Sequence, residues 1–366
     1  MACNVKIGDC APLTESRLRR ILDGITRTRV LVLGDFCLDI YWFIDPSRSE
    51  KSLETGRMTN PVSRQRYSPG GAGNVVNNLV AAGCRDVRAL GVIGDDPWGR
   101  EMTRQLEHIG VKTEDLLVQK ERWATLAYGK PHIGKQERQR FDFGNFNRLS
   151  SLTAETLLGR LRARVPEADA VIINQQVRQG IHTRGFRQGL VRLMREFPKT
   201  IFIADSRHFS ESFVTALLKI NDHEAARLCG TVRAAGAPVL RAEVHSAARE
   251  LFARTGKPVF VTRGSRGIVV MDDRGLCEIP GIRIRGRTDT VGAGDSALAG
   301  IGLALAAGSD TVEAAQLGSL VAGVTIRKLN QTGTASPREI LALVRESPRA
   351  GHAGPLDPLG GRRHLS

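Results

Sequence analysis

The chain has 366 residues, 41% of them hydrophobic, which is enough to bury a substantial core in one large α/β domain or in two domains. Its formal net charge of +15 would suit a nucleic-acid-binding protein, but Lys supplies only 10 of the 53 basic residues and the arginines are spread along the whole chain. Because nucleic-acid-binding surfaces normally cluster their basic residues, we interpret the charge as a general arginine bias and expect no nucleic-acid partner.

The cysteines and the hydrophobic runs indicate a cytoplasmic protein. The six cysteines are scattered, with no C-x-x-C pair and no His cluster nearby, which predicts neither a zinc site nor a disulfide framework. The N-terminus lacks the order of a signal peptide, and the longest weakly polar run, residues 297–308, is too short to span a bilayer. We therefore expect no membrane segment.

The predicted elements begin with an N-terminal helical extension, residues 1–27. Within it, residues 14–26 carry an apolar stripe at helical spacing after Thr14, a plausible N-cap. The stripe consists of Leu18, Ile21, Leu22 and Ile25.

Residues 28–345 read as the main domain. Arg29 to Gly34 is a continuous apolar run, typical of a strand buried on both faces of a parallel sheet, and Asp35 and Asp39 follow its carboxyl end. Similar runs recur at 87–93, 170–173, 200–204 and 258–262, with helical stretches such as 74–82 and 151–165 between them. This alternation predicts an α/β fold with a doubly wound, mostly parallel sheet and helices on both faces.

Two polar, arginine-rich segments with aromatic residues interrupt this rhythm, near 41–67 and 120–148. We expect them to form a small β lid over the site. The tail, residues 346–366, is rich in Gly and Pro with almost no apolar content, and we expect it to be disordered.

The strongest chemical motif is Asp289-Thr-Val-Gly292-Ala293-Gly294-Asp295, which opens a long Ala/Leu/Gly helix. Unpaired N–H groups at the positive end of such a helix suit an anion, and a transferring phosphoryl group is one. Asp295 could accept the proton of an attacking hydroxyl, so the candidate catalytic residues are Gly292, Ala293, Gly294 and Asp295.

Other interpretations of this motif remain open. The glycines could serve only a tight turn, with Asp295 as a helix cap. The pattern also formally matches a dinucleotide fingerprint, but no βαβ unit follows and no acid lies in the expected place. No G-x-x-x-x-G-K-[ST] occurs, which argues against a P-loop enzyme.

A second motif, Pro-Gly70-Gly71-Ala-Gly-Asn74, leads into a helix about 220 residues before Asp295. Paired glycines let backbone approach a ligand closely, and Asn74 offers a donor and an acceptor to sugar hydroxyls, although a turn without a ligand fits equally well. Together the two motifs resemble those of the PfkB, or ribokinase-like, carbohydrate kinases. Within that family, Gly-Asp35-Phe-Cys-Leu-Asp39 and the nearby Ser-Arg-x-Glu resemble the heptose-phosphate kinase domain.

The resemblance implies an ATP-dependent sugar kinase that uses Mg²⁺, and it leaves open whether a monovalent cation is also a cofactor. The acceptor sugar would be held by Asp39, Gly70, Gly71, Asn74 and Asp142. The nucleotide would be held by Asn221, Thr262, Gly264, Ser265 and Gly267. Glu224, in an N-x-x-E motif, would organise Mg²⁺ through water.

The chain departs from the heptose-kinase pattern at two places. Asn174-Gln175-Gln176 replaces a segment that carries an acid, and Asp205-Ser206-Arg207 replaces Asp-Pro-Lys. The acceptor therefore stays open: a sugar or sugar phosphate such as heptose 7-phosphate, or instead a simple ketose, pentose or nucleoside. A catalytically weak sugar-binding regulator is the alternative from another class, and a homodimer through the lid also remains open.

Overall fold

The computed structural model describes residues 7–8, 10–231, 233–234, 237–329 and 331–346. Apart from Glu346, the predicted disordered tail lies outside the described residues. The strands are β1 Ile7–Gly8, β2 Arg29–Gly34, β3 Phe36–Ile44, β4 Val62–Gly71, β5 Asp86–Gly94, β6 Lys112–Gln119, β7 Leu126–Ile133, β8 Gln136–Glu137, β9 Phe141–Phe143, β10 Ala170–Gln175, β11 Ile201–Ser206, β12 Leu217–Asn221, β13 Val259–Thr262, β14 Ile268–Asp272 and β15 Gly275–Ile279. The α-helices are α1 Glu15–Ile25, α2 Ala72–Ala81, α3 Pro97–His108, α4 Ser151–Arg164, α5 Arg184–Glu196, α6 Asp222–Leu228, α7 Arg241–Thr255, α8 Ala293–Ala306, α9 Thr311–Thr325 and α10 Pro337–Glu346.

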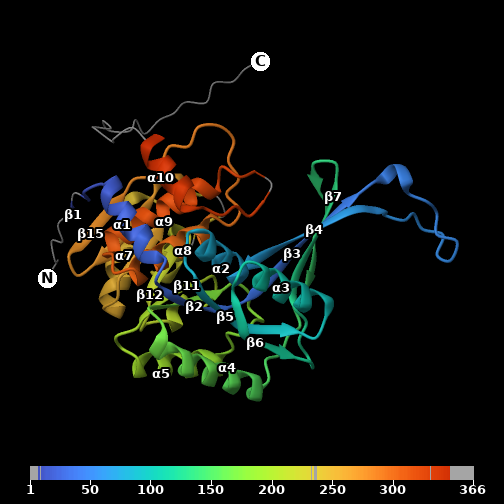
Figure 1. Cartoon of the computed structure of the whole chain (residues 1–366), viewed down its shortest axis with the longest axis horizontal. Coiled ribbons are helices and arrows are strands. Elements are labelled where there is room, and N and C mark those ends of the chain that lie inside the picture. The colour runs from blue at the N-terminus through green and yellow to red at the C-terminus, as the bar shows by residue number, and fades with distance from the viewer. Residues whose placement is uncertain (1–6, 9, 232, 235–236, 330, 347–366) are drawn as a thin grey trace.

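Ten strands form one large sheet in the order β1-β15-β14-β13-β12-β11-β10-β2-β5-β6. Neighbouring strands are parallel except at β13–β14 and β14–β15, which are antiparallel. In Figure 1, α4 and α5 lie below this sheet, and α1, α9 and α10 lie above it. The predicted α/β class, with a mostly parallel sheet between helices, is confirmed.

Each face of the sheet has its own hydrophobic core because side chains alternate along every strand. In β2, Val30 and Val32 belong to the cluster under α1, α2, α8, α9 and α10. Leu31 and Leu33 belong to the cluster against α4, α5, α6 and α7. Burial on both faces explains why the predicted strands are apolar without alternation.

The predicted elements agree well with those observed. Thr14 caps α1, and all four residues of its apolar stripe are buried. Each predicted run coincides with a strand: β2, β5, β10, β11 and β13. The edge strand β6, the short β12 and the β14–β15 hairpin were not singled out from the sequence.

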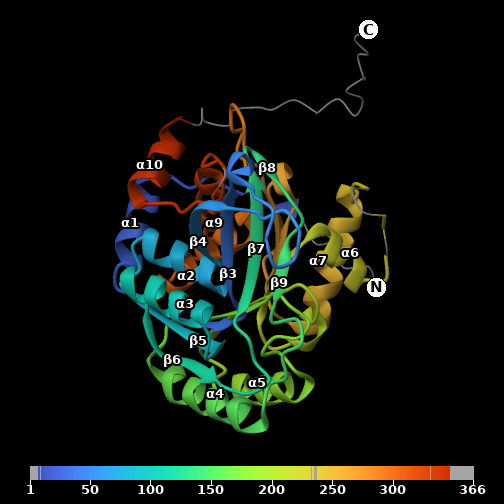
Figure 2. The ribbon, with the colours of Figure 1, turned by 90° about the vertical axis from the view of Figure 1, so that its right-hand side faces the viewer.

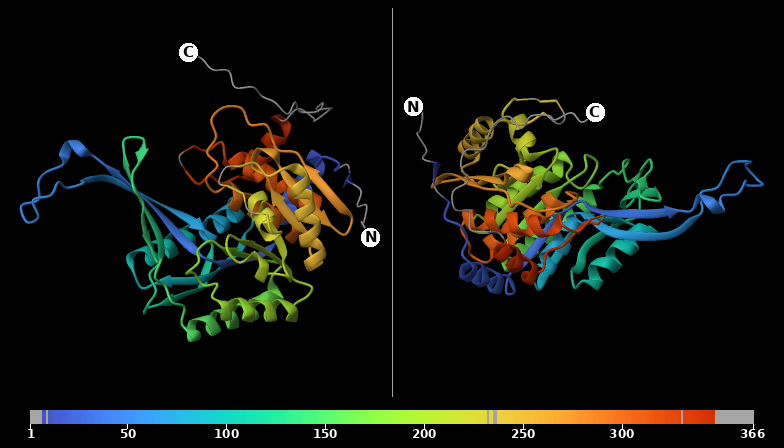
Figure 3. Two further views of the ribbon diagram at one scale, coloured as in Figure 1. Left: turned by 180° about the vertical axis from the view of Figure 1, so that it is seen from behind. Right: turned by 90° about the horizontal axis from the view of Figure 1, so that it is seen from above.

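A smaller sheet, ordered β4-β3-β7-β8 with β9 on β7, stands beside the large one. Strand β3 pairs antiparallel with β4 and parallel with β7, so segments far apart in the sequence lie side by side. Figures 1 and 3 show the outer part of the β3–β4 hairpin extending well away from the body, and Figure 2 views the small sheet from the front.

The expectation of no disulfide was wrong. A disulfide joins Cys10 to Cys277 and so links the N-terminal segment to β15. The short strand β1 pairs in parallel with the same strand. The two cysteines are 267 residues apart, so no local spacing could announce the pairing. Cys37, Cys84 and Cys229 are free thiols.

No helix within the described ranges is long and apolar enough to cross a membrane.

Breaking the disulfide should lower the free energy of unfolding by about 2–4 kcal/mol, because the bond restricts the unfolded chain. The measurement is urea denaturation of the wild type and of Cys10→Ser, each with and without dithiothreitol. Dithiothreitol should destabilise the wild type but not Cys10→Ser. The control variant Cys229→Ser, which keeps the disulfide, should be destabilised like the wild type. Equal stability of all samples in both buffers would mean that the bond does not form in solution.

Candidate active site

A cavity of about 230 Å³ lies where the carboxyl ends of the central strands meet the small sheet. Open α/β sheets bind ligands at this edge. The lining residues are Cys37, Asp39, Gly70, Gly71, Asn74, Tyr128, Arg140, Gln176, Arg207, Val291, Gly292, Asp295 and Thr332. Both glycine motifs of the sequence therefore contribute to one cavity.

Helix α8 begins at this cavity. Gly292 is its N-cap with φ +78°, and a Cβ there would lie 2.7 Å from Asn74 Nδ2, so the position requires glycine. The N–H of Ala293 donates to the carbonyl of Thr290 at 3.1 Å, so this amide of the predicted anion site is already bonded. The N–H groups of Gly294 and Asp295 lie in the first helical turn, where intrahelical acceptors are lacking.

Asp295 lies in the first turn of α8 and faces the other glycine motif. Asn74 Nδ2 donates to Asp295 Oδ2 at 3.0 Å. Burial, assisted by the charge of Asp205, raises the pKa of Asp295 to about 6, although the hydrogen bond from Asn74 and the charge of Lys219 oppose the rise. A carboxylate with such a pKa is ionised at neutral pH yet is a stronger base than an ordinary aspartate.

Strand β4 ends in the Gly70-Gly71 wall of the cavity. Gly71 has φ +55°, and a Cβ there would lie 2.5 Å from the carbonyl oxygen of Asp35, so only glycine fits. Asn74, almost fully buried in the first turn of α2, also accepts a hydrogen bond from Asn78 through Oδ1 at 3.1 Å. One donor and one acceptor of its side-chain amide are therefore already bonded to protein groups, which fixes its orientation against Asp295.

Two predicted acceptor contacts, Asp39 and Asp142, are already paired with cations. Asp39 Oδ1 lies 2.8 Å from Lys130 Nζ, and Asp39 lines the cavity. Asp142 holds Arg140 by two hydrogen bonds of 2.6 and 2.7 Å, and it is Arg140, not Asp142, that lines the cavity. Asp142 therefore lies behind Arg140, and its contact with the acceptor stays a prediction.

A buried ion pair that the sequence did not reveal lies beneath the start of α8. Lys219 Nζ is 2.7 Å from Asp205 Oδ2, and Lys219 is only 4% exposed. Burial lowers the pKa of Lys219, but the charge and hydrogen bond of Asp205, together with the charges of Glu224 and Asp295, outweigh burial and raise it. A Cβ on Gly294 would lie 3.2 Å from this amine, which places positive charge directly below the glycine turn. The sequence signal for this ion pair was the single Lys inside the apolar Leu-Leu-Lys-Ile run of β12.

Asn221 and Glu224 form a capping box at the start of α6. Asn221 Oδ1 accepts from the N–H of Glu224 at 2.8 Å, and Glu224 Oε2 accepts from the N–H of Asn221 at 2.9 Å. Burial raises the pKa of Glu224, with a further contribution from Asp205. Within the described ranges no cluster of three or more His, Cys, Asp or Glu could hold a metal ion. Mg²⁺ bound mainly by nucleotide phosphates and water needs only one or two carboxylates, so Glu224 and Asp205 fit it.

The remaining predicted nucleotide contacts form the turn between β13 and β14, away from the cavity lining. Gly264 has φ +56° and Gly267 has φ +91°, where a Cβ would lie 2.0 Å from the carbonyl oxygen of Ile279. Thr262 Oγ1 donates to the carbonyl of Ile220, and Ser265 belongs to the short 3-10 turn. The structure therefore gathers Asp39, Gly70, Gly71, Asn74 and the α8 turn around one cavity, and leaves 262–267 on a neighbouring strand end.

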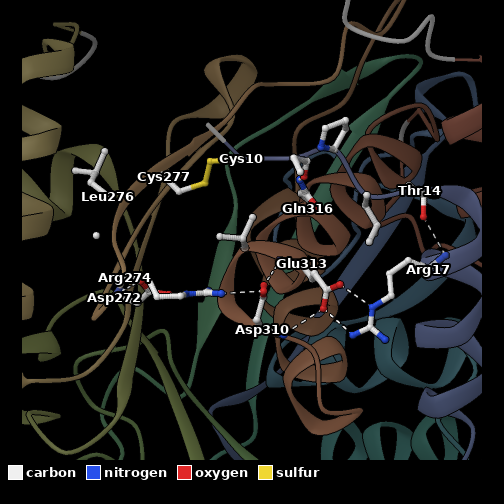
Figure 4. A pocket seen from close by; sticks show the side chains of 15 residues that line it. Cys10, Thr14, Arg17, Asp272, Arg274, Leu276, Cys277, Asp310, Glu313 and Gln316 are labelled. Carbon is white, nitrogen blue, oxygen red and sulfur yellow. Dashed lines mark hydrogen bonds and ion pairs between the residues drawn. A yellow bond between two sulfur atoms is a disulfide. The ribbon is translucent and has the colours of Figure 1, made fainter. Parts of the chain in front are cut away.

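A second, larger cavity of about 400 Å³ lies next to the Cys10–Cys277 disulfide, between the N-terminal segment, the β14–β15 hairpin and the start of α9 (Figure 4). Its charged side chains neutralise one another: Arg17 pairs with Glu313, and Arg274 bridges Asp272 and Asp310. It contains neither glycine motif. Size alone therefore does not make it the catalytic site.

Comparison with known proteins now decides the family. Residues 27–338 match the family model described as pfkB family carbohydrate kinase. The chain belongs to this family. It is accordingly a phosphotransferase that acts on a hydroxyl of a sugar, as the two glycine motifs predicted.

Individual relatives agree with this assignment. The chain is 31% identical over 359 residues to the bifunctional protein HldE of Hyphomonas neptunium, covering 95% of this chain and 70% of the relative. It is 29% identical over 332 residues to HldE of Desulfatibacillum aliphaticivorans and spans 66% of its length, just under two thirds. The similarity to a heptose-phosphate kinase domain is thus confirmed.

Among solved structures, ribokinase from Thermotoga maritima superposes with a TM-score of 0.65 at 19% identity, covering 87% of this chain and 100% of that one. Arabidopsis thaliana ribokinase complexed with ribose and ATP gives 0.65 at 16% identity, with 87% and 99% covered. At these identities the likeness establishes the ribokinase-like fold.

Replacing Lys219 with Met should destabilise the protein by about 3–5 kcal/mol, because Asp205 would be left buried without its cation. The measurement is urea denaturation. The double variant Lys219→Met/Asp205→Asn, which removes both charges, should recover part of the loss. A single variant as stable as the wild type would contradict a structural role for the pair.

Asp295→Asn should raise stability at pH 7.5 by about 1–3 kcal/mol. The folded-state pKa of about 6 exceeds the usual 3.8, so the folded state holds more protons between these values, and stability falls as the pH rises through that window. Asp295→Asn cannot ionise, so the variant does not lose stability in this way. Denaturation at pH 7.5 and pH 4 checks the prediction: the gain should disappear at pH 4. Asp23→Asn, on the exposed face of α1, should show no such pH-dependent gain; a similar gain there would attribute the effect to net charge.

Proposed function

We propose that the protein transfers the γ-phosphoryl group of ATP to a hydroxyl of a sugar or sugar phosphate, with Asp295 as general base. The observation that carries this proposal is the position of Asp295. It lies in the first turn of α8, in a cavity with the acceptor-side residues Asp39 and Gly70, and its pKa is raised to about 6. One cavity thus combines a base with a helix N-terminus that favours a phosphoryl group.

The steps follow from the geometry. Asp295 accepts the proton of the acceptor hydroxyl, whose oxygen forms a bond to the γ-phosphorus while the bond to the β–γ bridging oxygen breaks and ADP leaves. The amides of Gly294 and Asp295 stabilise the charge on the moving group, and Lys219 adds positive charge from below. Asn74 keeps the carboxylate of Asp295 oriented.

Glu224 and the nearby Asp205 would hold Mg²⁺ through water, and the ion would supply positive charge that neutralises part of the charge of the nucleotide phosphates. The nucleotide itself would follow the strand ends from Asn221 to the turn at Thr262–Gly267, as the family resemblance implies. Asn221 and Glu224 form their capping box at the start of this path.

The small sheet would act as a lid, because β3 carries Asp39 on the cavity side and β9 holds Arg140 in place through Asp142. Its outer parts expose Leu53, Met58 and Phe146, which would suit pairing with a second copy of the chain. We include such a homodimer in the proposal.

Heptose 7-phosphate is our first candidate acceptor, because the relatives named HldE match most of this chain. Arg207 in the cavity wall would favour an anionic sugar over a neutral one. A neutral ketose, pentose or nucleoside is the second candidate.

The test is ADP release from MgATP by the purified protein with heptose 7-phosphate, hexose 6-phosphates, free sugars and nucleosides. Turnover should rise with pH through about 6 as Asp295 ionises, and Asp295→Asn should lower it by about 100- to 10,000-fold while ATP still binds. Asp23→Asn serves as control and should retain wild-type turnover. If no acceptor stimulates ADP release although nucleotide binds, a sugar-binding regulator becomes the better account.

A further inference from the structure

A fully buried amide below the start of α8 has no hydrogen-bond partner. Asn174, near the carboxyl end of β10, is 0% exposed. Neither Oδ1 nor Nδ2 of its side chain forms a hydrogen bond with any group in the described part of the chain. Buried polar groups in native proteins are normally paired, so this amide indicates a contact that is made during function.

The packing of α8 on the sheet places this amide under Asp295. Ile172 points to the same face of β10 as Asn174, and a Cβ on Gly302 of α8 would lie 2.7 Å from Ile172 Cδ1. Helix α8 begins at the carboxyl edge of the sheet, so it runs in the direction opposite to β10. Moving back about 10 Å along α8 and forward about 7 Å along β10 from this contact leads to Asp295 and Asn174 respectively.

The neighbours of Asn174 in the sheet leave Asp295 as its partner. In the strand register, Asn174 lies between Gly34 of β2, which has no side chain, and Asp205 of β11. Asp205 is already paired with Lys219 at 2.7 Å. Burial raises the pKa of Asp295, and the amide of Asn174 is close enough to oppose that rise.

The two amides beside Asp295 differ in what they can offer it. Asn74 donates to Asp295 Oδ2 at 3.0 Å, and its own Oδ1 accepts from Asn78, so in this orientation Asn74 can only donate. No hydrogen bond within the described ranges fixes the amide of Asn174, which can present either its donor or its acceptor. A general base needs both, because its carboxylate only accepts hydrogen bonds whereas its protonated carboxyl group also donates one.

We propose that Asn174 is a positioning residue of the general base in both of its protonation states. Its Nδ2 donates to the carboxylate of Asp295 before phosphoryl transfer. The O–H bond of the acceptor then breaks, an O–H bond to Asp295 forms, and Oδ1 of Asn174 accepts from that new group, while Asn174 itself undergoes no covalent change. The inference rests on the proposed kinase function and adds to it a residue from the segment that departs from the heptose-kinase pattern.

The first experiment measures the pH–rate profile of Asn174→Leu, a variant of similar size without donor or acceptor, with the acceptor that the wild type turns over fastest. kcat should fall about 5- to 20-fold, while KM for ATP and for the acceptor changes less than about twofold. The midpoint of the profile should rise by about 0.5–1 pH unit, because the carboxylate of Asp295 loses a donor. Asn174→Ser, whose hydroxyl both donates and accepts, should recover part of kcat and of the wild-type midpoint. The other titratable groups around Asp295 are unchanged in these variants: Cys37, Arg140, Asp205, Arg207 and Lys219.

Urea denaturation at pH 4, where Asp295 is protonated, separates this role from a structural one. Leucine removes an unpaired amide from the interior, so Asn174→Leu should be no less stable than the wild type. The control Asn77→Leu removes a half-buried amide of α2 outside the cavity lining and should leave kcat and the pH–rate midpoint unchanged. A destabilised Asn174→Leu with wild-type kcat and midpoint would make Asn174 structural and overturn the proposal.

Titration of the Asp295 carboxyl group by carbon NMR, with its signal assigned through Asp295→Asn, needs no turnover. The pKa of Asp295 should be higher in Asn174→Leu than in the wild type. If the wild type phosphorylates no acceptor, the proposed function fails, whereas a raised pKa still supports the contact between Asn174 and Asp295. An unchanged pKa overturns the contact whether or not turnover is seen. Asn174→Ala replaces Asn174→Leu in each measurement if that variant does not fold.

Discussion

The hydrogen bond from Asn74 to Asp295 joins two helices that begin 221 residues apart in sequence, and the candidate active site depends on that junction. Both helices start after a glycine in a backbone conformation that other residues rarely adopt, Gly71 before α2 and Gly292 before α8. A Cβ on Gly292 would lie 2.7 Å from Asn74 Nδ2 of the other helix, whereas a Cβ on Gly71 would lie 2.5 Å from the carbonyl oxygen of Asp35. The positive ends of two helix dipoles therefore converge on the place where phosphoryl transfer would concentrate negative charge.

The electrostatics around that junction follow one pattern. Buried acids are matched with cations, as in Asp205 with Lys219 and Asp39 with Lys130, which keeps their charges inside the protein at tolerable cost. Asp295 and Asp35 are exceptions: no ion pair within the described ranges involves either carboxylate, and burial raises the pKa of both to about 6. An acid left without a salt bridge holds its proton more tightly, and this is the property that a base requires.

The sequence predicted the fold well because its signals were local. Strands buried on both faces are apolar runs, and paired glycines before a helix mark a turn at which the backbone can approach other groups closely. Contacts between residues from different strands or distant parts of the sequence could not be predicted in the same way. Asp142 lies in β9 and pairs with Arg140, which precedes the strand and lines the cavity, and the sequence does not reveal which of the two faces the cavity. Lys219 meets Asp205 only because β11 and β12 are neighbours in the sheet. The disulfide has the same character, since its cysteines come together only through the pairing of β1 with β15.

That disulfide also changes what a break in the backbone would do. The bond between Cys10 and Cys277 encloses the small sheet, the protruding β3–β4 hairpin and most of the large sheet in one covalent ring. A protease that cut the exposed hairpin tip once would open the ring without releasing a fragment. The nicked protein would keep the mass of the intact chain, apart from one added water, and would separate into two pieces only under reducing conditions.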